Sequence, residues 1–224
     1  MHREESTKYI GDLFHSSGKV KHNLLERTSK AHAILAEIRA ILTDVPLGKY
    51  RTEIGLQLRQ AMFINGLLFN SEVWQGAGSS DIKCLENVDH QLMRVICNGH
   101  AKTPLEFMYM ETAAQPLKYY IASRRIMYLH NILNKSSNEL IHRVYLAQRD
   151  NPTKGDFVEL VKADLENIGI DYDEEYFKGQ TKGQFKQHIK NNISKLVLRT
   201  LNLFNLITPR LETLITTSFI FNHT

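Results

Sequence analysis

Cysteine is scarce in this chain of 224 residues, which contains only Cys84 and Cys97. Two cysteines cannot build the disulfide framework of a small secreted domain, nor a zinc site made of paired C-x-x-C motifs. No run approaches the roughly 20 apolar residues of a membrane helix, and the polar start MHREESTK is not a signal peptide. We therefore expect an intracellular chain, in the nucleus or the cytoplasm, with no membrane partner.

The sequence also lacks the common catalytic signatures. It contains no G-x-x-x-x-G-K-[ST] loop, no Rossmann glycine fingerprint, no G-x-S-x-G turn and no H-E-x-x-H pair. Cys84, His90, Cys97 and His100 match no zinc spacing, and cysteines in an amphipathic helix are commonly small core residues. On the residues alone we predict no catalytic site, no bound metal and no cofactor.

Proline and glycine are few, five and twelve, and they mostly separate segments with a helical period. Apolar residues recur every three or four positions in residues 23–42, 82–96, 117–134 and 185–197, and residues 53–69 are apolar on most sides, as in a buried helix. Capping boxes are predicted at Thr103–Glu106 and Thr181–Gln184, and Asp156 and Gly169 should bound one helix. The predicted fold is mainly α, a multi-helix bundle with at most a short N-terminal β-hairpin.

Charge is unevenly distributed in the last quarter of a chain whose net charge is only +4. Acidic residues dominate residues 156–175, whereas residues 178–199 contain none. Within the basic segment, Lys182, Lys186 and Lys190 follow one another at one-turn steps on a single helical face. Two interpretations stay open: the acidic and basic helices pair with each other, or the lysine face binds phosphates.

Four blocks of sequence carry a family resemblance: residues 8–23, beginning KYIGDLFHSSGK, and residues 45–74, 85–133 and 144–170. In their order and length they resemble the C-terminal part of reverse transcriptases of non-LTR (LINE-type) retrotransposons, up to about Leu201. The resemblance implies a primer-grip-like hairpin (1–22), thumb-like helices (23–75), a connecting helical region (76–150) and a C-terminal helical region (151–205), followed by a divergent tail (206–224).

The resemblance also implies roles for particular residues. Tyr9, Ile10 and Gly11 correspond to the primer grip, and a glycine there allows close approach of a sugar-phosphate chain. The basic residues that follow, Lys19, Lys21, Arg27 and Lys30, become candidates for phosphate contacts, which give affinity without reading base sequence. Ordinary charge on a helix surface is the competing interpretation of these four residues.

Polymerases of this family hold two magnesium ions with palm carboxylates, typically in a Y-x-D-D turn, and this chain has no Asp-Asp pair. We therefore expect a fragment that is no enzyme on its own, with magnesium belonging to an upstream palm and fingers that are missing here. It would retain weak, sequence-independent binding to the backbone of an RNA–DNA or DNA duplex. The alternative is a decayed or domesticated helical interaction module with no nucleic-acid function; an independent enzyme is a third and less favoured class.

Overall fold

The computed structural model describes residues 6–9, 12–16, 20–74 and 79–207. It is mainly helical with one two-stranded antiparallel sheet at the N-terminus, as predicted. The elements follow in the order β1 (Ser6–Tyr9), β2 (Asp12–His15), α1 (Lys21–Thr43), α2 (Lys49–Leu58), the π-helical segment η1 (Arg59–Ile64), α3 (Asn65–Leu67), the 3-10 turn η2 (Ser71–Val73), α4 (Ser79–Ile96), α5 (Leu105–Thr112), α6 (Leu117–Leu133), α7 (Leu140–Asp150), α8 (Phe157–Asn167), α9 (Glu174–Gly179) and α10 (Lys182–Ile207).

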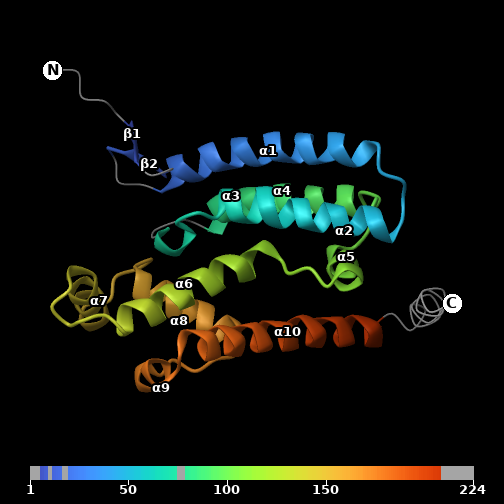
Figure 1. Ribbon diagram of the computed structural model, residues 1–224. Helices are drawn as coiled ribbons and strands as arrows, with labels where there is room; N and C mark the ends of the chain where they lie inside the picture. The colour runs from blue at the N-terminus through green and yellow to red at the C-terminus, as the bar shows by residue number, and fades with distance from the viewer. Residues whose placement is uncertain (1–5, 10–11, 17–19, 75–78, 208–224) are drawn as a thin grey trace, which may run out of the picture.

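The helices form successive layers (Figure 1). Helix α1 forms the outer layer on one side of the molecule and packs against α4. Helix α6 lies below these two helices in the view and contacts α8, α9 and α10. Helix α10 forms the opposite outside of the molecule and runs antiparallel to α6. Gly55 allows α2 and α4 to pack closely, because a Cβ at this position would lie 2.9 Å from the Ile96 side chain.

Two hydrophobic cores are built around opposite ends of α6. The first contains Leu117 and Ile121 together with residues of α1, α3 and α4, and the second contains Ile126 and Leu129 with residues of α7 to α10. Burying one apolar stripe of each helix is the main favourable contribution to such a fold. Because α6 contributes to both cores, it fixes how the two groups of helices lie relative to each other.

The hairpin is held on the helices by buried polar contacts. In β1 and β2, Tyr9 pairs with Asp12 and Lys8 with Leu13. The buried Asp12 carboxylate accepts hydrogen bonds from Asn23 Nδ2 at 2.8 Å and from Asn70 Nδ2 at 2.6 Å. Residues far apart in the sequence therefore attach this small sheet to α1 and to the turn after α3.

Several local predictions are confirmed. The Asp156 side chain accepts from the Glu159 amide at the start of α8, and Gly169, with φ +69°, follows the end of that helix. Thr181 and Gln184 form the predicted reciprocal capping box. The Thr181 amide donates to Gln184 Oε1 at 3.0 Å, and the Gln184 amide donates to Thr181 Oγ1 at 3.3 Å.

Two local predictions are wrong. Pro104 is itself the N-cap of α5, and no side chain caps that helix, so Thr103–Glu106 is not a capping box. Residues 53–69 do not form one regular helix, because the π-helical turn from Arg59 to Ile64 interrupts them. The wider turn changes the helical phase, and the buried side chains there are Arg59, Phe63 and Ile64.

Candidate nucleic-acid interface

Of the three predicted primer-grip residues, only Tyr9 falls within the described residues. Tyr9 is the last residue of β1, whereas Ile10 and Gly11, like Lys19, lie outside the described residues. Among the described basic residues nearby, Lys21 is exposed at the start of α1. Lys30 is exposed too, but its ammonium lies 3.0 Å from the Glu26 carboxylate, which also binds Lys8 at 2.8 Å. Lys21 therefore keeps the clearer access to a phosphate.

Arg27 does not present its charge on the surface, which corrects its prediction as a phosphate contact. The residue is 4% exposed, and its guanidinium lies 2.5 Å from Asp12 and donates to the carbonyl of Leu67. The same guanidinium lies 5.2 Å from the centre of the buried Trp74 ring. A cation held by a buried carboxylate and an aromatic ring acts in the core and is not available to a nucleic-acid strand.

The lysines of α10 are placed quite differently. Lys182, Lys186 and Lys190 are exposed, and no ion pair found among the described residues includes them. The interpretation in which the acidic segment pairs with these lysines is wrong. Acidic residues of that segment pair with arginines of other helices: Asp164 with Arg125 at 2.5 Å, and Glu174 with Arg149 at 3.4 Å. Lys178 does pair with Glu175, at 3.2 Å, but within α9.

The three lysines line one wall of a cleft of about 680 Å³, which we call the α6–α10 cleft. Its other wall comes from α6, and η2 and the α5–α6 connection contribute further lining residues. The cleft is lined by Glu72, Ala113, Gln115, Tyr120, Ser123, Arg124, Met127, Tyr128, Asn131, Lys182, Lys186, Ile189, Lys190 and Ile193. Two of these residues, Ile189 and Ile193, also belong to the second core.

Arg124 adds a fourth positive charge, on the α6 side of the cleft. One guanidinium nitrogen, Nη1, donates to the carbonyl of Leu68 at 2.6 Å, which anchors the side chain. Tyr120 and Tyr128 lie one turn to either side of Arg124 on the same helix. The positions of these residues repeat every four along α6, as those of the lysines do along α10, so each helix presents one row to the cleft.

One acid, Glu72 of η2, also lines the cleft. Burial raises the pKa of Tyr128, and the nearby charge of Glu72 raises it further. Tyr128 therefore stays a neutral aromatic surface at physiological pH. Four basic side chains face a single carboxylate, so the charge of the cleft favours an anion.

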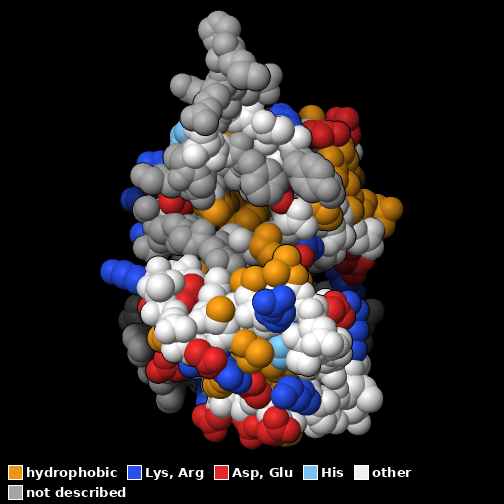
Figure 2. Space-filling view, turned by 90° about the vertical axis from the view of Figure 1, so that its left-hand side faces the viewer, with side chains coloured by type: hydrophobic (Ala, Val, Ile, Leu, Met, Phe, Trp, Pro, Cys, Tyr) orange, Lys and Arg blue, Asp and Glu red, His pale blue; other side chains and the backbone are white. Residues whose placement is uncertain are grey.

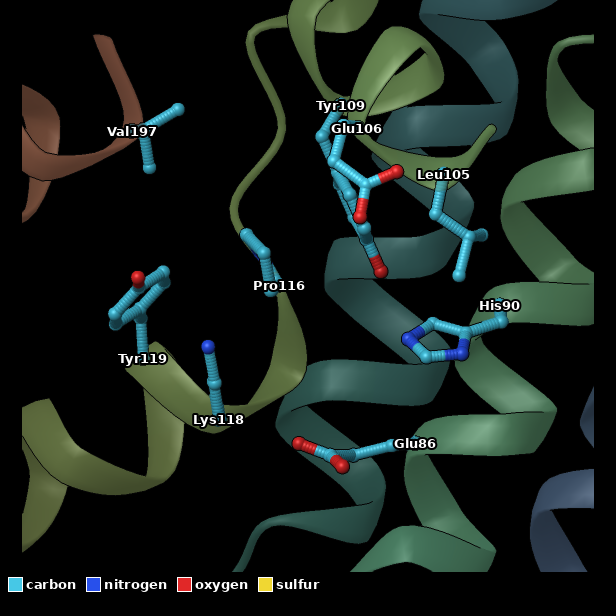
Figure 3. Close-up of a pocket in the computed structure, with 9 residues that line it drawn as sticks. All are labelled: Glu86, His90, Leu105, Glu106, Tyr109, Pro116, Lys118, Tyr119 and Val197. Atoms are coloured by element: carbon cyan, nitrogen blue, oxygen red, sulfur yellow. The ribbon is translucent and has the colours of Figure 1, made fainter. Parts of the chain in front are cut away.

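A smaller recess of about 290 Å³ lies between α4, α5 and the start of α6, and Val197 of α10 also lines it (Figure 3). Glu86 and His90 enter it from α4 and Glu106 from α5, with Lys118 at the start of α6. Burial lowers the pKa of His90 despite the acids around it, which favours the neutral imidazole. With two carboxylates and one ammonium, this recess has a charge that favours an anion less than that of the α6–α10 cleft.

Other reactive side chains are placed in structural surroundings. The Tyr109 hydroxyl donates to Asp89 at 3.1 Å, and burial and the Asp89 charge raise its pKa. Burial raises the pKa of Cys97 to about 11, so its thiol stays protonated.

Within the described ranges, no three His, Cys, Asp or Glu side chains gather into a group that could hold a metal ion. Of the helices described, none combines the length and apolar character that a membrane span requires.

Apolar side chains gather on the end of the molecule that carries the hairpin and α7 (Figure 2). A groove of about 400 Å³ lies there, lined by Val73, Leu140 and Val144 among others. Leu140 is 73% exposed, and Val73 and Val144 are exposed as well. Exposed apolar surface of this kind is typical of contacts with another protein.

Sequence reasoning found one wall of the cleft and missed the other. The lysine row was visible as a one-turn repeat without intervening acids. Tyr120, Arg124 and Tyr128 carry an equivalent repeat, but they lie in a strongly apolar helix whose buried face dominates the pattern. They line a cleft only because α10 lies opposite, and that placement joins residues about sixty positions apart.

The described fold is thus a layered helical protein with a basic, aromatic-lined cleft and a separate apolar groove. No protein-family model matches the chain, and no curated protein or solved structure matches it significantly.

Proposed function

We propose that this protein binds nucleic acid through the sugar-phosphate backbone, without reading base sequence, and that the α6–α10 cleft is the binding surface. One observation carries the proposal: Lys182, Lys186 and Lys190 line the cleft opposite Arg124 and have no ion-pair partner among the described residues. Unpaired lysines cost little to bring to a phosphate, since no existing ion pair is lost. Lysine contacts with phosphate release condensed counterions and give affinity that depends on salt.

The sequence resemblance supplies the biological setting of this proposal. In it, the chain corresponds to the primer-grip hairpin, thumb and connecting helices of a non-LTR retrotransposon reverse transcriptase. A template–primer duplex is then the expected partner, and DNA synthesis needs the palm and fingers of the polymerase. Magnesium would be held by that palm, and the chain alone would not polymerise.

The lysine row predicts a specific change in binding. Replacing Lys182, Lys186 and Lys190 together by alanine should weaken binding to a fluorescent DNA or RNA–DNA oligonucleotide, because up to three phosphate contacts are lost. The slope of log K against log salt should fall by about 1 per lysine. Fluorescence anisotropy at several salt concentrations measures both quantities.

Lys195→Ala is the matched control. Lys195 is also exposed on α10, but it lies away from the cleft, so its loss should leave the salt slope nearly unchanged. If the wild-type protein has no affinity at low salt, or if the control weakens binding as much per lysine as the triple variant, the cleft is not the binding surface.

The second candidate function is a helical interaction module with no nucleic-acid role. The exposed apolar groove beside α7 favours it, because Leu140 and Val144 offer a partner side chain more contact than a charged surface does. The same titration separates the two candidates. Absence of binding to every oligonucleotide at low salt would leave the interaction module as the function to pursue.

A further inference from the structure

The two walls of the α6–α10 cleft differ in chemistry and match in spacing. Lys182, Lys186 and Lys190 repeat every four residues on α10, and Tyr120, Arg124 and Tyr128 repeat every four residues on α6. In an α-helix, four residues correspond to a rise of about 6 Å. Successive phosphates of an extended nucleic-acid strand are separated by a similar distance. One wall therefore suits a line of phosphates, and the other offers aromatic rings at every second step.

We propose that the α6–α10 cleft holds one single strand of nucleic acid, with the lysine row on its phosphates and its bases against Tyr120 and Tyr128. This inference rests on the proposed function and names the form of nucleic acid that the cleft accepts. In a template–primer, the strand in the cleft would be an unpaired overhang and not the duplex itself.

Neighbouring side chains contact both tyrosine rings of the cleft. The Arg59 guanidinium lies 5.6 Å from the centre of the Tyr120 ring, and Phe157 packs edge-on against Tyr128, with ring centres 5.7 Å apart at 89°. These contacts hold both rings in fixed orientations, while both residues still line the cleft. Rigid aromatic rings stack on bases of any identity, because every base has a π face.

A duplex does not satisfy this geometry. Its bases are stacked and paired inside the helix, so rings recessed in a cleft cannot reach their faces unless the strand is unpaired. The cleft volume of about 680 Å³ also lies in the range of pockets for small ligands, which suits a few nucleotides better than a double helix. A duplex could contact the lysine row only along the rim.

The test compares three fluorescent probes of one sequence: a single strand, a blunt duplex and a duplex with a single-stranded overhang. At equal salt, the single strand and the overhang should bind about tenfold more tightly than the blunt duplex, because only they supply unpaired bases for stacking. Equal affinity for the blunt duplex and the single strand would overturn the inference.

Variants separate stacking from charge. Tyr120→Phe and Tyr128→Phe should keep the preference for the single strand, and Tyr120→Leu with Tyr128→Leu should abolish it without changing the salt slope. Tyr50→Leu is the control, because Tyr50 is 70% exposed on α2, away from the cleft. Circular dichroism melts identify any variant that fails to fold.

A cross-linking experiment on the wild-type protein tests the inference without any substitution. A single strand containing 5-iodouracil should cross-link on irradiation to Tyr120 or Tyr128, identified by mass spectrometry of the peptides. Cross-links confined to residues outside the cleft would contradict the inference.

The outcomes separate the two proposals. If the lysine variant loses binding but the tyrosine variants do not, the proposed function stands and the single-strand inference fails. If no probe binds at all, both fail.

Discussion

Asp12 illustrates how a single side chain organises the N-terminal end of the molecule. Its carboxylate accepts from Asn23, Asn70 and Arg27, and so joins the hairpin, α1 and the turn after α3. Burial opposes its ionisation, but the bonds from Asn70, Arg27 and Asn23 outweigh that effect and lower its pKa below 3.8. The sequence suggested that Arg27 is a cation on the surface of a helix, but it belongs to this buried cluster.

The lowered pKa of Asp12 predicts how stability changes with pH. Because the folded pKa lies below the unfolded value of 3.8, the carboxylate contributes fully above about pH 4 and less as the pH falls through the folded pKa. Asp12→Asn should therefore destabilise the protein by about 1.5–3 kcal/mol at neutral pH, and the difference should shrink in acid. Urea unfolding at pH 7 and at lower pH measures it.

Glu26→Gln is a suitable control for this experiment. Glu26 pairs with Lys8 and Lys30 near the surface, where an ion pair contributes at most about 1 kcal/mol. A control that destabilises the protein as much as Asp12→Asn would show that burial of the Asp12 cluster is not the cause.

Among the elements, the π-helical segment η1 begins with a buried arginine that its neighbours hold by several hydrogen bonds. Arg59 Nε and Nη2 donate to the two Asp89 oxygens, each at 2.7 Å, and Nη2 also donates to the carbonyl of Gln115 at 2.9 Å. Both side chains are buried, with exposed fractions of 2% and 0%. This bidentate pair attaches η1 to α4 and to the segment that leads into α6.

Removing one member of this pair should be costly. Asp89→Ala leaves the Arg59 charge buried without a counter-charge, which should lower the free energy of unfolding by about 3–5 kcal/mol. Replacing both residues by apolar side chains, in Arg59→Met with Asp89→Leu, should recover most of that loss. Chemical denaturation of the two variants checks the expectation, and a double variant as unstable as Asp89→Ala would contradict it.

On the scale of the whole molecule, α6 is the element on which both cores and the cleft depend. Ile121 belongs to the first core and Ile126 to the second, and Tyr120, Arg124 and Tyr128 between and beside them face α10. A single continuous helix therefore connects the two groups of helices and determines how they are oriented relative to each other. Binding at the cleft should be sensitive to any break in it.

Ser123 lies in α6 between the residues of the two cores, so Ser123→Pro tests this dependence. Proline removes an intrahelical hydrogen bond and clashes with the preceding turn, at a cost of about 3 kcal/mol or more. We expect calorimetry to resolve two unfolding transitions in place of one, and nucleic-acid affinity to fall because the α6 row is divided. Ser123→Ala, which keeps the helix, should retain one transition, and a single transition in Ser123→Pro would contradict the role given to α6.

The sequence by itself determined the features that depend on neighbours along the chain. Helical periodicity located the buried faces of α1, α6 and α10, and the caps at Asp156 and Thr181 followed from side chains three residues from their partners. The lysine row on α10 was visible for the same reason, since residues four apart share a helical face.

Only the tertiary structure decided what each charged residue faces. Arg27 and Lys30 look alike in the sequence, yet one is bound to Asp12 in the core and the other lies on the surface. The lysine row forms one wall of a cleft only because α6 places Tyr120 and Arg124 opposite it. Burial and charge pairing depend on contacts between distant segments, and no local period encodes them, which is why the cleft could not be predicted from the sequence.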